Sequence, residues 1–500
     1  MTGPRAVAAP QAPVGGQVES DLDRRVVRGS AWLALSHGGH TVAWMVTLFV
    51  LARILDPADF GITSIAGTIL LLGGYVQQAG TGAALVQRRT DLREAAASAL
   101  LFNLVTGLAF YALVFVLAPV AASFFGAPEL EDVIRVLAIA VAVRSIAWIG
   151  VALLERELRF ARAASAEIAA AVVEMTVAIG FAVGGAGVWS IVFGQLAGAL
   201  VQVGVTWALV TRRPSLRDAN LRVTRELFSF GKFVSAGHLL VFVAASIDNL
   251  FVGRILGATA LGYYALAYRL AAIPGAVLGV IAERVTLPAY SMLVSDRSAF
   301  KRAYLANLQR LSFLTLPLGV GLIVAAEPLV VGLLGARWEP AVEPLRLLAV
   351  FGVLESLAGS TAAVFQAAGR PQLLPLTTLL GLAALLPLLW ILTSRHGTTG
   401  AALAMILGLT PVAAVRIALA ARIVGAAPVD VARALWPPGL CAALLAAALI
   451  GLTAATAELA AGATLAVLVV GGAAAYALAA RLFAPSVLHP IVAGFRRSTT

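Results

Sequence analysis

The chain has 500 residues, of which 60% are hydrophobic and only 12% are charged, and its mean hydropathy of +0.94 lies outside the range of soluble globular domains. The net charge of +11 does not indicate a nucleic-acid-binding protein, because the Lys and Arg residues lie in short loops beside apolar stretches and form no basic domain. The one cysteine, Cys441, excludes a disulfide framework and a cysteine-based metal site.

Apolar stretches of about 20 residues recur along the chain, and each is long enough to cross the hydrocarbon core of a bilayer as a helix. Residues 1–23 are rich in Ala, Pro, Gly and Gln and predict a disordered tail. The apolar span that follows Arg24 and Arg25 is too long for a signal peptide. We expect about fourteen transmembrane helices, near 29–54, 60–86, 95–122, 133–153, 163–183, 187–210, 233–256, 260–282, 304–326, 341–368, 372–393, 398–422, 434–454 and 460–483.

The connections between these helices alternate in charge. Those after odd-numbered helices are poor in basic residues, and the connection 123–132 contains none. Those after even-numbered helices carry Lys and Arg, as at Arg88, Arg89 and Arg93. Basic loops of polytopic proteins stay in the cytoplasm, so we predict a multi-pass protein of the inner (cytoplasmic) membrane with both termini, including the tail 486–500, in the cytoplasm.

The predicted fold is an all-α polytopic membrane protein with two six-helix bundles, at 24–214 and 232–425. The segment 215–231 alternates apolar and basic residues at helical spacing, which predicts an amphipathic interfacial helix linking the bundles. Two extra transmembrane helices are expected within 426–485.

The two bundles share sequence patterns that indicate an internal duplication. Arg53 closes the first helix in the same context as Arg254 closes the seventh, at an offset of 254 − 53 = 201. Further on, Arg135 matches Arg346 at 346 − 135 = 211. Both repeats start in the cytoplasm, so they are parallel repeats related by an axis along the membrane normal, one of the arrangements on which alternating-access transporters are built.

With this organisation the chain resembles the multidrug/oligosaccharidyl-lipid/polysaccharide exporter superfamily, specifically its Wzx-like polysaccharide-unit flippases, over roughly residues 24–485. The matching motifs are Arg28-Gly29-Ser30, Leu51-Ala52-Arg53-Ile54-Leu55-Asp56-Pro57-Ala58-Asp59-Phe60-Gly61, Gly82-Ala83-Ala84-Leu85-Val86-Gln87-Arg88, Asp248-Asn249-Leu250-Phe251-Val252-Gly253-Arg254 and Leu287-Pro288-Ala289-Tyr290-Ser291. The resemblance implies a carrier that flips isoprenoid-diphosphate-linked glycans to the outer leaflet. It also leaves polysaccharide polymerase and chain-length proteins open as partners.

Ionisable residues inside membrane spans usually line a cavity or pair with each other. Arg144 and Glu174 lie at matching depths in neighbouring helices. They either form a structural ion pair, or Arg144 binds the diphosphate and Glu174 a coupling proton. Asp248 and Arg269 also match in depth, with Asn249 beside them, and the resemblance places their helices at a central cavity. We therefore expect Asp248 to couple an ion and Arg269 and Asn249 to bind substrate.

Glu355 is a third ion-coupling candidate. In the other repeat the equivalent residue is Arg144, at an offset of 355 − 144 = 211. Opposite charges would then line the two halves of the cavity. Arg416 lies closer to a helix end, where we expect it to snorkel to the interface. Arg53 and Arg254, at basic-poor helix ends, are candidates for substrate contact at an outward gate, for headgroup binding or for helix capping.

His37 and His40 are candidates for a proton relay or for interhelical hydrogen bonds. The chain has no Walker-type loop, so neither ATP nor any other cofactor is expected. Two further carriers stay open: a cation-coupled multidrug antiporter, which typically has twelve helices, and a peptidoglycan-precursor flippase, which has fourteen. The short external loops disfavour a membrane glycosyltransferase or ligase, so we do not expect an enzyme.

Overall fold

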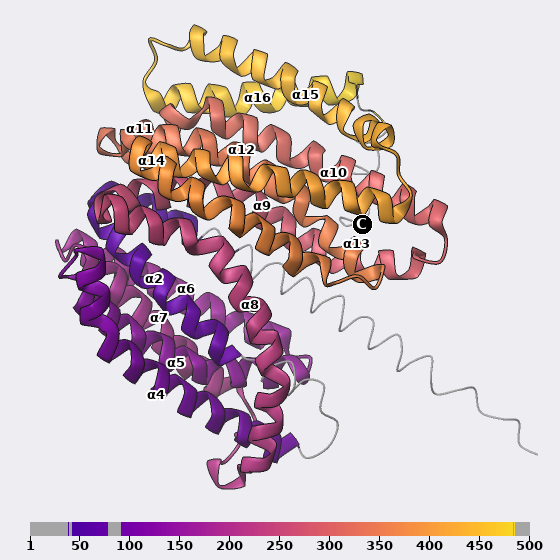
Figure 1. Cartoon of the computed structure of the whole chain (residues 1–500). Coiled ribbons are helices and arrows are strands. Elements are labelled where there is room, and N and C mark those ends of the chain that lie inside the picture. The colour runs from indigo at the N-terminus through magenta and orange to yellow at the C-terminus, as the bar shows by residue number, and fades with distance from the viewer. Residues whose placement is uncertain (1–38, 40–42, 79–91, 484, 486–500) are drawn as a thin grey trace, which may run out of the picture.

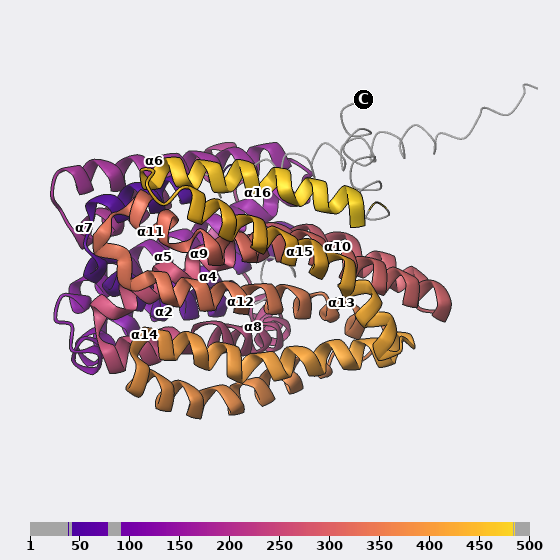
Figure 2. The same cartoon turned by 90° about the horizontal axis from the view of Figure 1, so that it is seen from above.

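The computed structural model describes residues 39, 43–78, 92–483 and 485, and every regular element in these ranges is a helix (Figures 1 and 2). Within them, nine helices are long and apolar enough to cross a membrane, and two shorter apolar helices, Ala43–Ile54 and Pro57–Leu71, accompany them. The predicted all-α membrane fold is confirmed. The expected tails and the candidates His37 and His40 lie outside the described residues.

The helices form two bundles, drawn in indigo to purple and in pink to orange in Figure 1. The first contains Ala43–Ile54, α2 (Pro57–Gln78), α4 (Leu92–Phe125), α5 (Leu130–Arg156), α6 (Phe160–Val183) and α7 (Val188–Leu209). The second contains α8 (Leu221–Leu256), α9 (Ala258–Leu293), α10 (Arg297–Val324), α11 (Ala326–Leu334), α12 (Val342–Gly359), α13 (Thr361–Ala367) and α14 (Leu373–Val424). The last pair is α15 (Pro428–Ala455) and α16 (Ala461–Phe483).

The long element α14 consists of two helices that meet at Gly397. This residue has φ +61° and ψ −142°, a conformation that residues with a Cβ rarely adopt and that interrupts the helix. The two parts lie side by side in Figures 1 and 2. The break lies where the sequence predicts the connection between 372–393 and 398–422.

The predicted separate linker helix at 215–231 is replaced by a different local structure. Leu216–Asp218 form a 3-10 turn, after which α8 begins at Leu221 and continues without a break to Leu256. The Asn220 side chain caps α8 by accepting a hydrogen bond from the Arg222 N–H at 2.8 Å. The segment therefore extends a long helix: no proline separates it from the span that follows, and Gly231 at the junction lies within α8. The bundle boundaries themselves stay a prediction.

The two ends of the molecule differ in how the bundles pack. We call the end with the connections 126–129 and 184–187 the basic-poor end, and the end with 157–159 and 368–372 the basic end. At the basic-poor end one continuous apolar core joins the bundles through residues that include Leu51, Phe60, Leu130, Val188, Leu261, Trp338 and Leu389. At the basic end the described residues form two separate cores, one with Ala99, Ile149 and Val210, the other with Tyr304, Phe365 and Ala421.

The bundles are therefore joined at one end and diverge towards the other, as the ribbons of Figure 1 also show. The final helices α15 and α16 pack on the outer side of the second bundle, against α10 and α11 (Figures 1 and 2). The Tyr476 hydroxyl anchors α16 by donating a hydrogen bond of 2.6 Å to the Phe313 carbonyl oxygen.

The α10 helix begins at a side-chain cap on the basic end. The Asp296 carboxylate accepts hydrogen bonds from the N–H groups of Ser298 at 2.9 Å and Ala299 at 3.0 Å. The Ala299 N–H, together with the Ser298 hydroxyl, holds the pKa of the Asp296 carboxyl below its usual range. The cap fixes where α10 starts.

Candidate functional site

Helices α2 and α9 cross so closely at the basic-poor end that two glycines are required. A Cβ atom on Gly61 would lie 1.8 Å from the carbonyl oxygen of Ala258, and a Cβ atom on Gly262 would lie 1.8 Å from that of Pro57. Gly262 follows Gly61 by 262 − 61 = 201 positions, and Ala258 follows Pro57 by the same number. The contact is therefore reciprocal and follows the repeat that the sequence predicts.

A second contact fastens the bundles beside this crossing, and it involves the connection η2 (Ala336–Ala341). The Trp338 indole N–H donates to the Ala52 carbonyl oxygen at 2.6 Å, and the Arg337 guanidinium donates to the Arg53 carbonyl oxygen at 2.7 Å. Arg337 also lies 3.1 Å from the Asp56 carboxylate. These bonds satisfy the carbonyl groups at the end of the first helix. We refer to Arg337 and Trp338 as the latch.

The latch was not predicted from the sequence, although Arg337 departs from the basic-poor character of its connection. The two predicted arginines of this end both make contacts within the protein. Arg53 donates to the Leu333 carbonyl oxygen at 2.9 Å, close to the end of α11, and Arg254 lies 5.0 Å from the centre of the Phe124 ring. Of the roles considered for Arg53, these contacts match helix capping.

Arg144 of α5 and Glu174 of α6 form an ion pair at 2.7 Å, with about a third of each side chain exposed (38% and 34%). Gly198 of α7 leaves room for it, because a Cβ atom there would lie 2.9 Å from the Glu174 carboxylate. This contact corresponds to the structural ion pair, one of the two alternatives that the sequence left open for Arg144 and Glu174. Glu174 offsets the charge of Arg144 in this arrangement.

Asp248 does not pair with Arg269, although their depths in the sequence are similar. The buried Asp248 carboxylate accepts a hydrogen bond of 2.7 Å from the Tyr264 hydroxyl, and its second oxygen, Oδ1, has no partner among the described residues. The side-chain oxygen of Asn249 also lacks a described partner. Among the described residues, the Asp248 oxygen therefore remains free to take a proton or a cation, and the Asn249 oxygen remains free to accept a hydrogen bond or bind a cation.

Arg269 reaches from α9 towards the first bundle. One of its nitrogen atoms lies 3.4 Å from the Ser64 hydroxyl of α2, and no described carboxylate lies within ion-pair distance of its guanidinium. A cation placed between two bundles without a balancing carboxylate is a suitable site for an anionic ligand.

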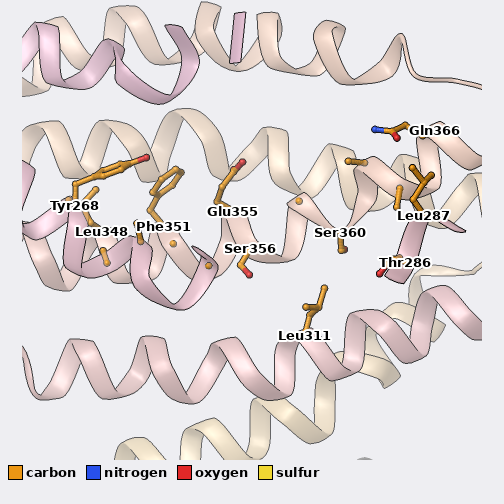
Figure 3. Close-up of a pocket in the computed structure, with 17 residues that line it drawn as sticks. Tyr268, Thr286, Leu287, Leu311, Leu348, Phe351, Glu355, Ser356, Ser360 and Gln366 are labelled. Carbon is orange, nitrogen blue, oxygen red and sulfur yellow. The ribbon is translucent and has the colours of Figure 1, made fainter. Parts of the chain in front are cut away.

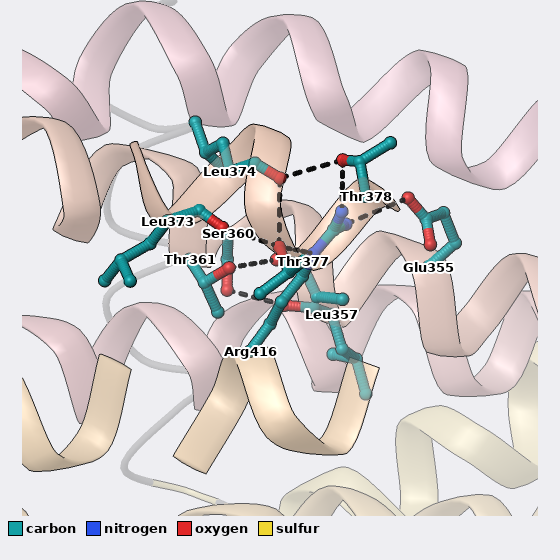
Figure 4. A network of polar contacts seen from close by, with 10 residues as sticks. Glu355, Leu357, Ser360, Thr361, Leu373, Leu374, Thr377, Thr378 and Arg416 are labelled. Carbon is teal, nitrogen blue, oxygen red and sulfur yellow. Dashed lines mark hydrogen bonds and ion pairs between the residues drawn. The ribbon is translucent and has the colours of Figure 1, made fainter. Parts of the chain in front are cut away.

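Glu355 of α12 pairs with Arg416 of α14, as Figure 4 shows. The Arg416 guanidinium donates to the Thr377 and Thr378 hydroxyls at 2.9 and 2.8 Å, and its nearest Glu355 oxygen lies at 3.9 Å. Arg416 is only 15% exposed, so it holds a buried polar network and does not snorkel to the interface as expected. Glu355 is 49% exposed. The depths of these residues in their predicted helices did not indicate that Arg416 is the partner of Glu355.

Glu355 lines a cavity of about 510 Å³ inside the second bundle. Figure 3 shows Tyr268 at one end of it, Gln366 at the other, and Glu355 and Ser356 between them. We call this cavity the slot. The described residues of its lining come mainly from α9, α10, α12 and α13, and among them only Glu355 is charged. Within the described ranges, no cluster of His, Cys, Asp and Glu could hold a metal ion.

Comparison with known proteins gives consistent matches. A family profile described as "Polysaccharide biosynthesis protein" matches residues 50–343. The teichuronic acid biosynthesis protein TuaB of Bacillus subtilis is 25% identical over 371 residues, which cover 70% of this chain and 73% of that protein. The lipopolysaccharide biosynthesis protein WzxC of Escherichia coli is 24% identical, covering 70% and 71%. The succinoglycan biosynthesis transport protein ExoT of Rhizobium meliloti is 28% identical, covering 65% and 66%.

Solved membrane transporters share the fold. The lipid II flippase MurJ in an inward closed conformation superposes with a TM-score of 0.68 at 13% identity, covering 91% of this chain and 99% of MurJ. An inward-facing multidrug resistance MATE family transporter gives 0.65 at 20% identity, covering 77% and 94%. An outward-facing MATE family transporter gives 0.56 at 18% identity, covering 79% and 95%.

Proposed function

The chain belongs to the family of polysaccharide biosynthesis proteins, and on this basis we propose that it is a flippase that moves isoprenoid-diphosphate-linked oligosaccharide units across the cytoplasmic membrane for export of a surface polysaccharide. It acts as a carrier and not as an enzyme. The relatives TuaB, ExoT and WzxC are named for the biosynthesis or transport of such polymers, which supports this cargo over a cationic drug. The family match also favours it over a peptidoglycan precursor.

The observation that carries the mechanism is the unequal packing of the two ends. The bundles share a core, the glycine crossing and the latch at the basic-poor end, whereas the described residues of the basic end form separate cores. Because basic loops face the cytoplasm, this arrangement corresponds to a state closed to the outside and accessible from inside. Transport then requires the crossing to open.

Arg269 is the residue we assign to the diphosphate. It lies between the bundles, donates to Ser64 of the first bundle and has no carboxylate partner among the described residues. Arg144 becomes available to phosphate when its pair with Glu174 opens. A phosphate that replaces Glu174 as the partner of Arg144 would supply the differential interaction that a ligand needs to shift a conformational equilibrium. Asn249, Arg53 and Arg254 are further candidates for substrate contact.

We assign ion coupling first to Asp248, because its carboxylate is buried with one oxygen unpaired among the described residues. Burying an unpaired carboxylate costs free energy, and binding a proton or a cation reduces that cost. Either a proton or a cation could therefore bind at Asp248. Glu174 and Glu355 are weaker candidates, since each has an arginine partner.

A deletion strain tests the function. We expect one completed isoprenoid-linked glycan to accumulate on the cytoplasmic side and the matching surface polymer to disappear. An unchanged lipid profile together with increased sensitivity to cationic drugs would instead favour a multidrug antiporter. Accumulation of the peptidoglycan precursor would identify that lipid as the cargo.

A further inference from the structure

We propose that the slot is the glycan subsite of this carrier, and that the sugar occupying it carries no negative charge. The inference rests on the proposed function and extends it to the location and charge of the sugar. The slot measures about 510 Å³, within the range of about 300–1,000 Å³ typical of small-molecule sites. Its lining combines apolar side chains with a few polar groups, the composition with which such sites fix the orientation of a ligand.

The polar groups of the slot are available for a ligand. The hydroxyls of Tyr268 and Ser356 and the amide of Gln366 line the slot, and no described residue forms a hydrogen bond with them. Glu355 approaches Arg416 only to 3.9 Å, which is longer than a hydrogen bond, so its carboxylate retains its acceptor capacity. Hydroxyl, amide and carboxylate groups in one cavity suit a polyhydroxylated ligand, whose hydroxyls both donate and accept.

The slot also provides apolar surface. The aromatic rings of Tyr268 and Phe351 both line the slot and are drawn towards the same end of it in Figure 3. The faces of such rings pack against apolar groups, and a pyranose ring presents C–H groups on its faces. The slot can therefore hold both the hydroxyl edges and the apolar face of a sugar.

The charge of the slot argues against the diphosphate as its occupant. Glu355 is the one charged side chain among the described residues that line the slot, and the arginine that pairs with it is 15% exposed and committed to Thr377 and Thr378. A like charge inside a cavity disfavours an anion. The slot should thus reject a phosphate and also a uronic acid, whose carboxylate would lie near Glu355.

The position of the slot fits a sugar attached to a phosphate. Tyr268 lines the slot, and the next residue, Arg269, reaches out of it towards Ser64 of the first bundle. Neighbouring residues on a helix point about 100° apart, so α9 presents the two side chains to adjoining spaces. A diphosphate at Arg269 would place its first sugar at the entrance of the slot.

The test uses the purified full-length protein and measures the affinity of polyprenyl diphosphate, bare or carrying a single hexose, N-acetylhexosamine or hexuronic acid. In Gly359→Phe the new side chain fills the slot, because Gly359 lines it and no heavy atom lies within 4 Å of its Cβ position. Gly321→Phe is the matched control, since Gly321 has equally open surroundings and does not line the slot. Glu355→Gln removes the charge alone.

We expect the wild-type protein to bind at least one neutral glycosylated lipid about tenfold more tightly than the bare lipid, as two net hydrogen bonds would give. Gly359→Phe should abolish this preference and leave binding of the bare lipid unchanged, and Gly321→Phe should retain it. Glu355→Gln should improve binding of the hexuronic acid lipid.

Three results would overturn the proposal. A preference that survives Gly359→Phe would exclude the slot as the sugar site and leave the flippase function standing. Preferred binding of the hexuronic acid lipid by the wild-type protein would refute the charge argument. Binding of tetraphenylphosphonium that depends on Glu355, with no binding of any polyprenyl diphosphate, would overturn the subsite and the flippase function together.

Discussion

Gly61 and Gly262 occupy equivalent positions in the two bundles, and each lies against a backbone carbonyl of the other bundle. The distance from the Cβ position to that carbonyl oxygen is 1.8 Å in both cases. No side chain fits such a gap without moving the helices apart. The two residues therefore report directly on whether the basic-poor end is closed.

Replacing Gly61 or Gly262 with alanine should open this end. The added methyl group would collide with a carbonyl oxygen and favour the state in which α2 and α9 separate. Ile65, which is fully buried, serves as the reporter when changed to cysteine in a Cys441→Ala background. An external membrane-impermeant maleimide should label Ile65→Cys at least about tenfold faster in either glycine variant, as a shift of ~1.4 kcal/mol would give.

Gly67→Ala is the control for this experiment, because it lies on the same helix and its Cβ position has no heavy atom within 4 Å. Labelling that stays slow in the Gly61 and Gly262 variants would show that the crossing tolerates the methyl group and does not act as a gate.

The latch should contribute to the same closure. Trp338→Phe removes the indole N–H that the Ala52 carbonyl accepts, and leaving that buried oxygen unpaired costs about 1–3 kcal/mol. The maleimide assay should therefore show an increase in opening of about tenfold or more. Trp436→Phe, on an exposed site of α15, should have no effect. Equal labelling of the Trp338→Phe and Trp436→Phe variants would show that the latch does not contribute to closure.

Arg269 should be more important for transport than Arg144. Arg269→Gln removes a cation that no described carboxylate balances, and we expect it to reduce flipping of a diphosphate-linked glycan by about tenfold or more, as one lost charge-assisted contact would. Arg269→Lys should restore part of the rate, because it keeps the charge. A rate that is unchanged in Arg269→Gln would place the diphosphate elsewhere.

A double-mutant cycle separates the two roles of the pair Arg144 and Glu174. If the pair is structural, Arg144→Gln and Glu174→Gln should each impair transport, while the double variant should recover, because no charge is then left without its partner. If Arg144 also binds phosphate after the pair opens, as we propose, the double variant should remain impaired. Flipping rates of the three variants provide the measurement.

Asp248→Asn should uncouple transport from the ion gradient. The amide oxygen can still accept the hydrogen bond from Tyr264, so the helix contact is retained while the ionisable group is lost. We expect flipping to become independent of an imposed proton or sodium gradient. Tyr264→Phe, which leaves the carboxylate in place, should keep the dependence. Gradient-dependent flipping in Asp248→Asn would exclude this residue as the coupling site.

Hydropathy and the distribution of arginine predict the all-α membrane fold, because the length of an apolar helix and the side of a basic loop follow directly from the bilayer. The repeat offset also relates Gly61 to Gly262. The partner of Asp248 could not be predicted, since helical depth fixes position along the membrane normal and leaves rotation about the helix axis undetermined. For the same reason Arg416 was missed as the partner of Glu355.

The latch could not be predicted from the sequence for a different reason. Trp338 binds a carbonyl that lies 338 − 52 = 286 positions earlier in the chain, and no local pattern indicates a contact of that span. The residues expected to form a separate linker helix form a 3-10 turn and the first turns of α8. Amphipathic spacing at 215–231 fits the start of a long helix as well as it fits a separate helix.

Flippase activity can be measured by reconstituting the purified protein in vesicles that contain a polyprenyl diphosphate-linked glycan and following exposure of the glycan to an external glycosidase. With the protein we expect all of the glycolipid to become cleavable, with Arg269→Gln the inner-leaflet share should become cleavable about tenfold or more slowly, and with empty vesicles only the outer-leaflet share should be cleaved. Protection of the inner-leaflet share in the presence of the wild-type protein would contradict the assignment as a flippase.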